Sequence, residues 1–86
     1  MEKAVLSYRV IIEPEKIGRK TVYNAYCPSL GVADYGDSME EVLKSMKDGI
    51  KLAIECLLEE KRDVPKDNIE EQVITSVRIP ANILTP

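Results

Sequence analysis

One segment constrains the fold of this chain more than any other: a long amphipathic helix, predicted to start at Ser38 and to run for about 24 residues. The Ser38 hydroxyl can accept a hydrogen bond from an amide of the first turn, and Glu41 can bond back toward the helix start, which is the capping-box pattern. Gly49 in the middle costs about 1 kcal/mol relative to alanine, which indicates a close approach to another element. A helix with one apolar side is expected to lie on a sheet. That side carries Val42, Leu43, Met46, Ile50, Ala53, Ile54, Leu57 and Leu58.

The first strand is predicted from an alternating pattern over residues 4–13, which Pro14 is expected to end. Residues 15–19 follow as a solvated hairpin loop in which Gly18 can take a positive φ. One face of the strand is apolar and is expected to point toward the core. It carries Leu6, Tyr8, Val10 and Ile12.

Two further strands precede the helix. Residues 20–27 are rich in β-forming side chains, and Pro28, which cannot donate to a ladder, closes that strand. A turn through Gly31 leads into a short third strand, residues 32–35. Three consecutive strands with short connections predict an antiparallel meander.

The chain after the helix is predicted to be a polar connector, residues 59–71, followed by a last strand, residues 72–79. Acidic residues outnumber basic ones in the connector, which fits either an acidic decoy for a basic partner or a solvated loop, and the loop is favoured. The strand is expected to end at Pro80, before a short tail at 81–86. Both faces of this strand carry apolar side chains, whereas one helix covers only one face of a sheet. We therefore expect self-association, as a dimer or a higher oligomer, through residues 72–79.

These segments predict one α+β domain with the order β-β-β-α-β, an antiparallel sheet with one long helix packed on one face. A chain of 86 residues has no room for a second core, so the domain is expected to span 1–86 with its core at about 4–80. With 44% hydrophobic and 31% charged residues, the composition is that of a globular protein.

The chain contains no histidine, which excludes metal sites with histidine ligands, Ser-His and Cys-His nucleophile pairs and imidazole acid–base chemistry. Cys27 and Cys56 are too few for a zinc site and are expected to be free thiols in a reducing compartment, with a disulfide as the alternative. The net charge of −3 gives no general attraction to nucleic acid phosphates. We expect no enzymatic activity, cofactor or metal. A signal peptide or membrane segment is not recognisable, so a cytoplasmic location is expected.

Two pairs of residues could still bind a metal ion or a nucleic acid base. Asp34 and Asp37 are an acidic pair near a strand end, where carboxylates could hold a metal, but a turn residue and a residue just before the helix cap are the favoured interpretation. Tyr23 and Tyr26 could stack on bases, but their odd spacing places them on opposite faces of a strand. Binding of nucleic acid by the chain alone is therefore not expected.

The residues Tyr23-x-x-x-x-Pro28-x-Leu30-x-Val32, followed by Gly36-Asp37-Ser38-Met39-Glu40-Glu41-Val42, resemble the HicB-like antitoxin domain. The resemblance covers roughly residues 5–61. Two features depart from the family pattern: the P-x-L-P-G turn is one residue shorter, so that Gly31 follows Leu30 directly, and Val42 takes the place of a small alanine.

The resemblance implies a sheet with one helix, similar to a partial ribonuclease H fold without its active site, and the neutralisation of a HicA-type toxin, a small basic mRNA endonuclease. Many members of the family also bind their promoter through helices at the C-terminal end. Residues 75–80 are similar to the strand that opens a ribbon-helix-helix, but too few residues follow for its two helices, so DNA binding is not expected. The alternative is a stand-alone oligomeric scaffold or a small-ligand module without a toxin. If there is a toxin, the candidate contact residues are Glu55, Glu59, Glu60 and Asp63.

Overall fold

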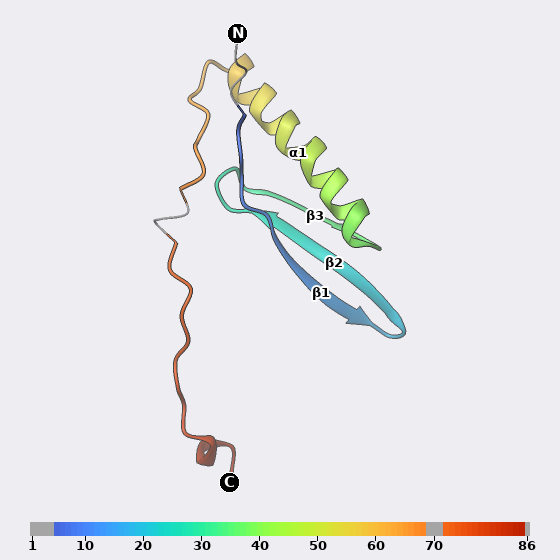
Figure 1. Ribbon diagram of the computed structural model, residues 1–86, viewed down its shortest axis with the longest axis vertical. Helices are drawn as coiled ribbons and strands as arrows, with labels where there is room; N and C mark the ends of the chain where they lie inside the picture. Colours follow the sequence, from blue (N-terminus) through green and yellow to red (C-terminus); the bar gives the residue numbers. More distant parts are fainter. Residues whose placement is uncertain (1–4, 69–71, 86) are drawn as a thin grey trace.

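The computed structural model describes residues 5–68 and 72–85 and shows a three-stranded antiparallel sheet with one long helix packed against one face (Figure 1). The α+β prediction is therefore confirmed. The sheet has the order β1-β2-β3, which is the predicted meander. Its elements are β1 (Ile11–Ile17), β2 (Lys20–Cys27), β3 (Val32–Gly36) and α1 (Met39–Glu59), with a short 3-10 helix, η2 (Ala81–Leu84), near the C-terminal end.

The first hairpin differs from its prediction. Pro14 does not end the strand: it lies inside β1, opposite Tyr23, and only two residues separate Ile17 from its partner Lys20. A proline is tolerated here because β1 is an edge strand, where the missing N–H can face away from the ladder. Gly18 in the tight turn has a φ of 66°, as expected. Residues 5–10, here called the N-terminal arm, form no strand, and β2 ends at Cys27, so residues 5–9 have no β2 residue opposite them.

The second hairpin agrees with its prediction. The bounds of β2 are those expected, and β3 is one residue longer, ending at Gly36. In the turn between them the Gly31 amide donates to the Cys27 carbonyl at 2.9 Å, and Gly31 has a φ of 67°. Tyr23 packs toward the core and Tyr26 is exposed, so the two tyrosines lie on opposite faces as predicted.

The start of α1 confirms Ser38 as its N-cap. The Ser38 hydroxyl accepts a hydrogen bond from the Glu41 amide at 3.1 Å. The return bond differs from the capping box, because the Glu41 carboxylate accepts from the Asp37 amide, at 3.2 Å, one residue before the cap. The helix spans 21 residues, somewhat fewer than predicted, and ends at Glu59, two residues before Lys61, which has a positive φ.

The core lies between α1 and the sheet. Its buried residues among those described are Ala25, Cys27, Val42 and Met46. A Cβ atom on Gly49 would stand 3.1 Å from Val32 Cγ1, which confirms the predicted close approach of helix and sheet. Cys27 and Cys56 are both free thiols, the first buried and the second exposed. The half-buried apolar residues that surround this core include Tyr8, Val10, Ile12, Tyr23, Leu30, Val32 and Ile50.

The predicted strand at residues 72–79 is absent, so the sheet has three strands instead of four. This stretch belongs to residues 72–85, here called the C-terminal segment, which runs away from the sheet and the helix (Figure 1). Residues 72–79 do alternate between apolar and polar side chains. A strand also needs a neighbouring backbone to pair with, and the segment has none because it runs away from the sheet. The radius of gyration is 17.6 Å, whereas a compact chain of this length has one of about 12 Å.

In the described part of the chain, α1 is the only long helix, and it lacks the apolar length needed to cross a bilayer.

Candidate functional site

The residues that carry the sequence motif build the fold. Tyr23 and Leu30 pack against the core, and Pro28 lies in the turn between β2 and β3. Gly36 stands where β3 meets α1, and a Cβ atom there would lie 3.0 Å from the Val42 amide nitrogen. Asp37 and Ser38 complete this junction through the hydrogen bonds given above, and Glu40 is exposed in the first helical turn. These motif residues therefore have structural roles.

The two aspartates considered for metal chemistry each have a structural partner. Asp34 accepts hydrogen bonds from the Ser45 hydroxyl of α1 and from the Tyr35 amide. The Ser45 hydroxyl, followed by the Tyr35 amide, holds the pKa of Asp34 below its ordinary value. Asp37 lies on the surface with its carboxylate 3.4 Å from the Lys20 ammonium. Within residues 5–68 and 72–85, no three cysteine, aspartate or glutamate side chains are grouped so that they could hold a metal ion.

The four predicted contact residues lie at the C-terminal end of α1 and in the first residues after it, and all four are exposed. We call Glu55, Glu59, Glu60 and Asp63 the acidic end of α1. Only Glu60 has an ion-pair partner among the described residues, an Arg62 guanidinium nitrogen at 3.3 Å. The last turn of the helix contains no basic residue. Carboxylates are unfavourable at this end because the helix dipole is negative there, so helix stability does not explain them.

The face of the sheet opposite α1 is open and partly aromatic. Ile11, Tyr26 and Tyr35 are 38%, 46% and 71% exposed. They surround a shallow hollow of about 590 Å³ that Glu13, Asn24 and Ala33 also line. We call this surface the open face. Its side chains come from all three strands.

A third group of residues was not predicted from the sequence. Asp67 in the connector accepts from Arg9 Nε at 2.9 Å and from the Ser29 hydroxyl at 2.6 Å, and Tyr8 donates to the Pro65 carbonyl at 2.6 Å. The Ser29 hydroxyl, and after it the Arg9 guanidinium, holds the pKa of Asp67 below its ordinary value. We call Arg9, Ser29 and Asp67 the clasp. No local signal could have identified it, because its members are far apart in the sequence.

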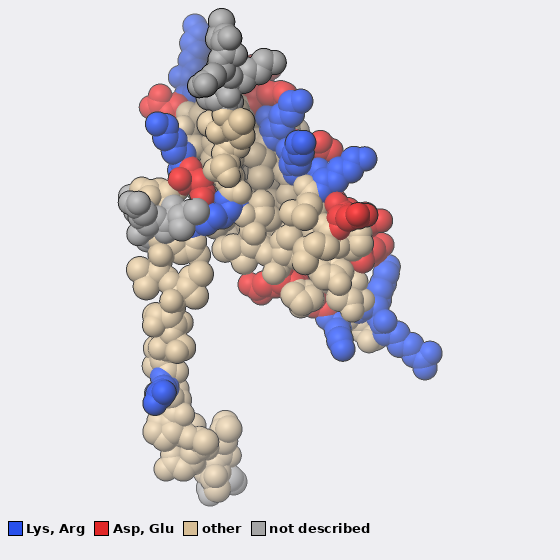
Figure 2. All heavy atoms as spheres, in the orientation of Figure 1, with Lys and Arg blue, Asp and Glu red and all other residues tan. Residues whose placement is uncertain are grey.

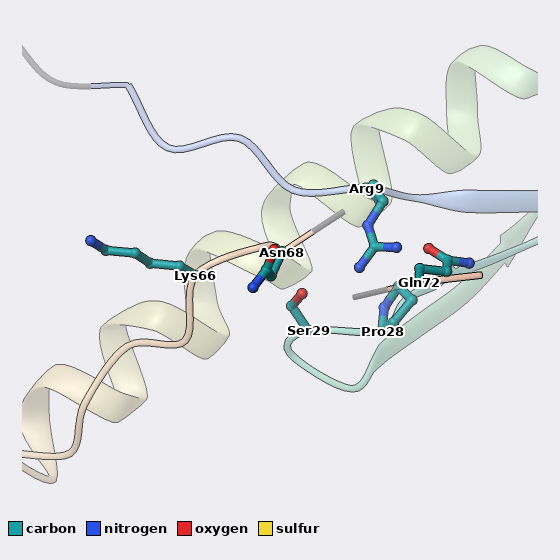
Figure 3. A pocket seen from close by; sticks show the side chains of 6 residues that line it. All are labelled: Arg9, Pro28, Ser29, Lys66, Asn68 and Gln72. Atoms are coloured by element: carbon teal, nitrogen blue, oxygen red, sulfur yellow. The ribbon is translucent and has the colours of Figure 1, made fainter. Parts of the chain in front are cut away.

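A pocket of about 460 Å³ adjoins the clasp, and Figure 3 shows Arg9 pointing into it toward the turn with Pro28 and Ser29, while Lys66 points away. Arg9 Nη1 is buried and has no hydrogen-bond partner among the described residues. The guanidinium is already neutralised by Asp67, whose side chain is 5% exposed. The group thus holds the connector against the arm and the turn. The pocket lining is completed by Asn68 and Gln72.

Comparison with known proteins finds a relative that matches most of this chain. The chain is 37% identical over 68 residues to UPF0150 protein ssr1765 of Synechocystis sp. (strain ATCC 27184 / PCC 6803 / Kazusa), a match that covers 78% of this chain and 82% of the relative. No family model matches the sequence, and no solved structure matches it.

Proposed function

The chain belongs to the UPF0150 family, and we propose that it is an antitoxin-like protein that binds and neutralises a small basic mRNA endonuclease of the HicA type. The proposal takes the partner from the HicB-like pattern of residues 23–42. The observation that carries it is the acidic end of α1, where carboxylates are exposed at a position that disfavours them for helix stability. A basic partner would offset that cost.

The two surfaces have different roles in this proposal. The acidic end of α1 steers the basic toxin to the chain, which raises the association rate more than the affinity. The open face supplies the lasting contact through its exposed Tyr26 and Tyr35, since buried tyrosines are frequent binding hot spots. The chain itself performs no reaction in this role, needs no cofactor or metal, touches no nucleic acid and acts in the cytoplasm. We also propose that the fold is HicB-like, that is, similar to a partial ribonuclease H fold.

The direct test is co-expression with any small basic protein that is encoded beside this chain. We expect the neighbour to arrest growth alone and to be tolerated when this chain is present. A harmless neighbour, or one equally toxic with and without this chain, would overturn the proposal and favour a stand-alone scaffold or small-ligand module.

Charge reversal at the acidic end tests the steering role. Glu59→Lys together with Glu60→Lys should slow association with the toxin about tenfold at low salt, weaken its salt dependence and leave the dissociation rate unchanged. Glu40→Lys together with Asp48→Lys changes the net charge equally at exposed positions of α1 away from that end, so it should slow association less. Stopped-flow kinetics at several salt concentrations measure both pairs. Equal slowing by both pairs would show that only net charge matters.

Truncation on the open face tests the contact. Tyr35→Ala should raise the dissociation rate at least tenfold, since a hot-spot side chain contributes about 2 kcal/mol or more. Leu52→Ala removes another exposed side chain, 61% accessible and located on α1, and should leave the dissociation rate unchanged. If both variants dissociate like the parent, the toxin does not bind the open face.

A further inference from the structure

The C-terminal segment is an apolar strand-forming sequence without a partner. Val73, Ile74, Val77 and Ile79 are 82%, 85%, 81% and 63% exposed. Figure 2 shows this part of the molecule as almost uncharged, and Arg78 is the one charged residue between 72 and 85. A soluble protein rarely leaves such a continuous apolar surface uncovered, so the segment needs a binding surface.

A groove that fits such a strand lies between the N-terminal arm and α1. The backbone of the helix lies close to β2 and β3 and farther from β1, so part of its apolar stripe extends beyond the sheet. The resulting groove has a volume of about 390 Å³ and two lysines, Lys47 and Lys51, among its lining residues. Its apolar lining comes from Leu6, Tyr8 and Val10 of the arm and from Leu43, Met46, Ile50 and Ile54 of α1.

The two edges of the sheet offer poorer places for an added strand. At the β3 edge, the Tyr35 amide already donates to the Asp34 carboxylate at 2.8 Å. At the β1 edge, Pro14 has no amide hydrogen to donate. The arm contains no proline between residues 5 and 10 and pairs with no strand of the described chain. The backbone N–H and C=O groups of the arm are therefore available to pair with an added strand.

The geometry points to a second copy of this chain as the occupant. The clasp holds Asp67 against Arg9 and Ser29, and the C-terminal segment then leads away from the helix (Figure 1). We infer that residues 72–79 of each copy lie as an extended strand beside the N-terminal arm of the other and fill its groove. The exchange is reciprocal, so it closes as a two-fold dimer in which residues 72–79 of both copies have a binding surface.

The side chains of the segment suit this arrangement. Val73, Val77 and Ile79 lie on one side of an extended strand, and this side can face the groove. Arg78 then lies on the other side, away from Lys47 and Lys51. In the dimer, the second copy thus supplies the fourth strand, which a single chain does not form. It does not depend on a toxin, so its tests and those of the proposed function can fail separately.

Disulfide trapping between two marked chains tests the exchange. Both chains carry Cys56→Ser, which removes the exposed thiol and leaves only the buried Cys27. A size-tagged chain with Leu43→Cys in the groove is refolded together with an untagged chain with Val77→Cys, and oxidised. We expect a cross-link between tagged and untagged chains, and a weaker one when Leu52→Cys, outside the groove, replaces Leu43→Cys. Cross-links only between two Val77→Cys chains would overturn the inference in favour of segment-to-segment pairing.

Light scattering of the otherwise unmodified protein gives an independent readout. We expect a mass of twice 9.7 kDa that falls to the monomer value in Val77→Asp and in Leu43→Asp. Ser76→Asp and Leu52→Asp place the same charge on the segment and the helix, outside the groove contact, and should stay dimeric. A monomeric parent would overturn the inference, whether each segment folds into its own groove or awaits a different protein.

Discussion

The end of α1 depends on a single residue, Lys61, in a backbone conformation that favours glycine. Its φ is 56°, and around it the Arg62 amide donates to the Leu57 carbonyl at 2.9 Å and the Lys61 amide to the Leu58 carbonyl at 3.1 Å. These two bonds form a Schellman motif, in which glycine usually takes the left-handed position because a Cβ atom is strained there.

Replacing this residue should therefore stabilise the protein. Lys61→Gly is expected to raise the free energy of unfolding by about 1 kcal/mol, which raises the melting temperature by about 4–8 °C in a domain of this size. Lys61→Ala keeps the strain and loses the same charge, so it should melt like the parent. Thermal melts at one protein concentration measure both. If the two variants melt at the same temperature, left-handed strain at Lys61 is not a cost.

Among the elements, the clasp joins three segments that no ladder connects: the N-terminal arm, the turn between β2 and β3, and the connector. Its Asp67 carboxylate has a lowered pKa because it accepts from Ser29 and Arg9. The unfolded chain therefore binds a proton at Asp67 at a higher pH than the folded chain does. Between the two pKa values the free energy of unfolding rises with pH. The stabilisation by Asp67 is therefore full above the pKa of the unfolded chain, the ordinary aspartate value of about 3.9. It is lost as the pH falls through the lowered pKa of the folded chain.

Asp67→Asn should remove part of this acid sensitivity. We expect the variant to be less stable than the parent near neutral pH, with a difference that shrinks as the pH falls from about 6 to about 3. Asp34 also has a lowered pKa and keeps some acid sensitivity in both proteins. Asp63→Asn, in the exposed part of the connector, serves as the control and should follow the parent. Urea unfolding at several pH values gives the comparison, and a constant difference between Asp67→Asn and the parent would contradict the role of the carboxylate.

The whole molecule is elongated, with extents of 63 × 33 × 26 Å, because the C-terminal segment adds length without adding to the core. All four buried residues precede the connector, and the C-terminal segment supplies no residue that packs against them. The exchanged dimer predicts that the melting temperature of the full chain rises with protein concentration, since association stabilises the folded state. A chain that ends at Asn68 should unfold cooperatively at a temperature independent of concentration. Concentration-independent melting of the full chain would contradict the dimer.

Features whose signals lie within a few residues could be predicted from the sequence. The bounds of β2, the turn through Gly31 and the Ser38 cap follow from β-forming side chains, glycine freedom and a hydroxyl beside free amides, and all are found. The opposite faces of Tyr23 and Tyr26 follow from the two-residue period of a strand. The acidic end of α1 was also recognisable, as a group of exposed carboxylates.

Features that depend on what lies beside a segment could not be predicted, because they arise only in the folded chain. Pro14 is a strand residue because β1 is at an edge, and the same proline in a central strand would have ended it. The alternation in residues 72–79 describes a strand, but no neighbouring backbone lies within reach of it in the folded chain. Arg9 meets Asp67 only because the helix returns the connector to the arm. Local patterns set the backbone preference of each segment, whereas pairing is a contact between distant residues and exists only once the whole chain is folded.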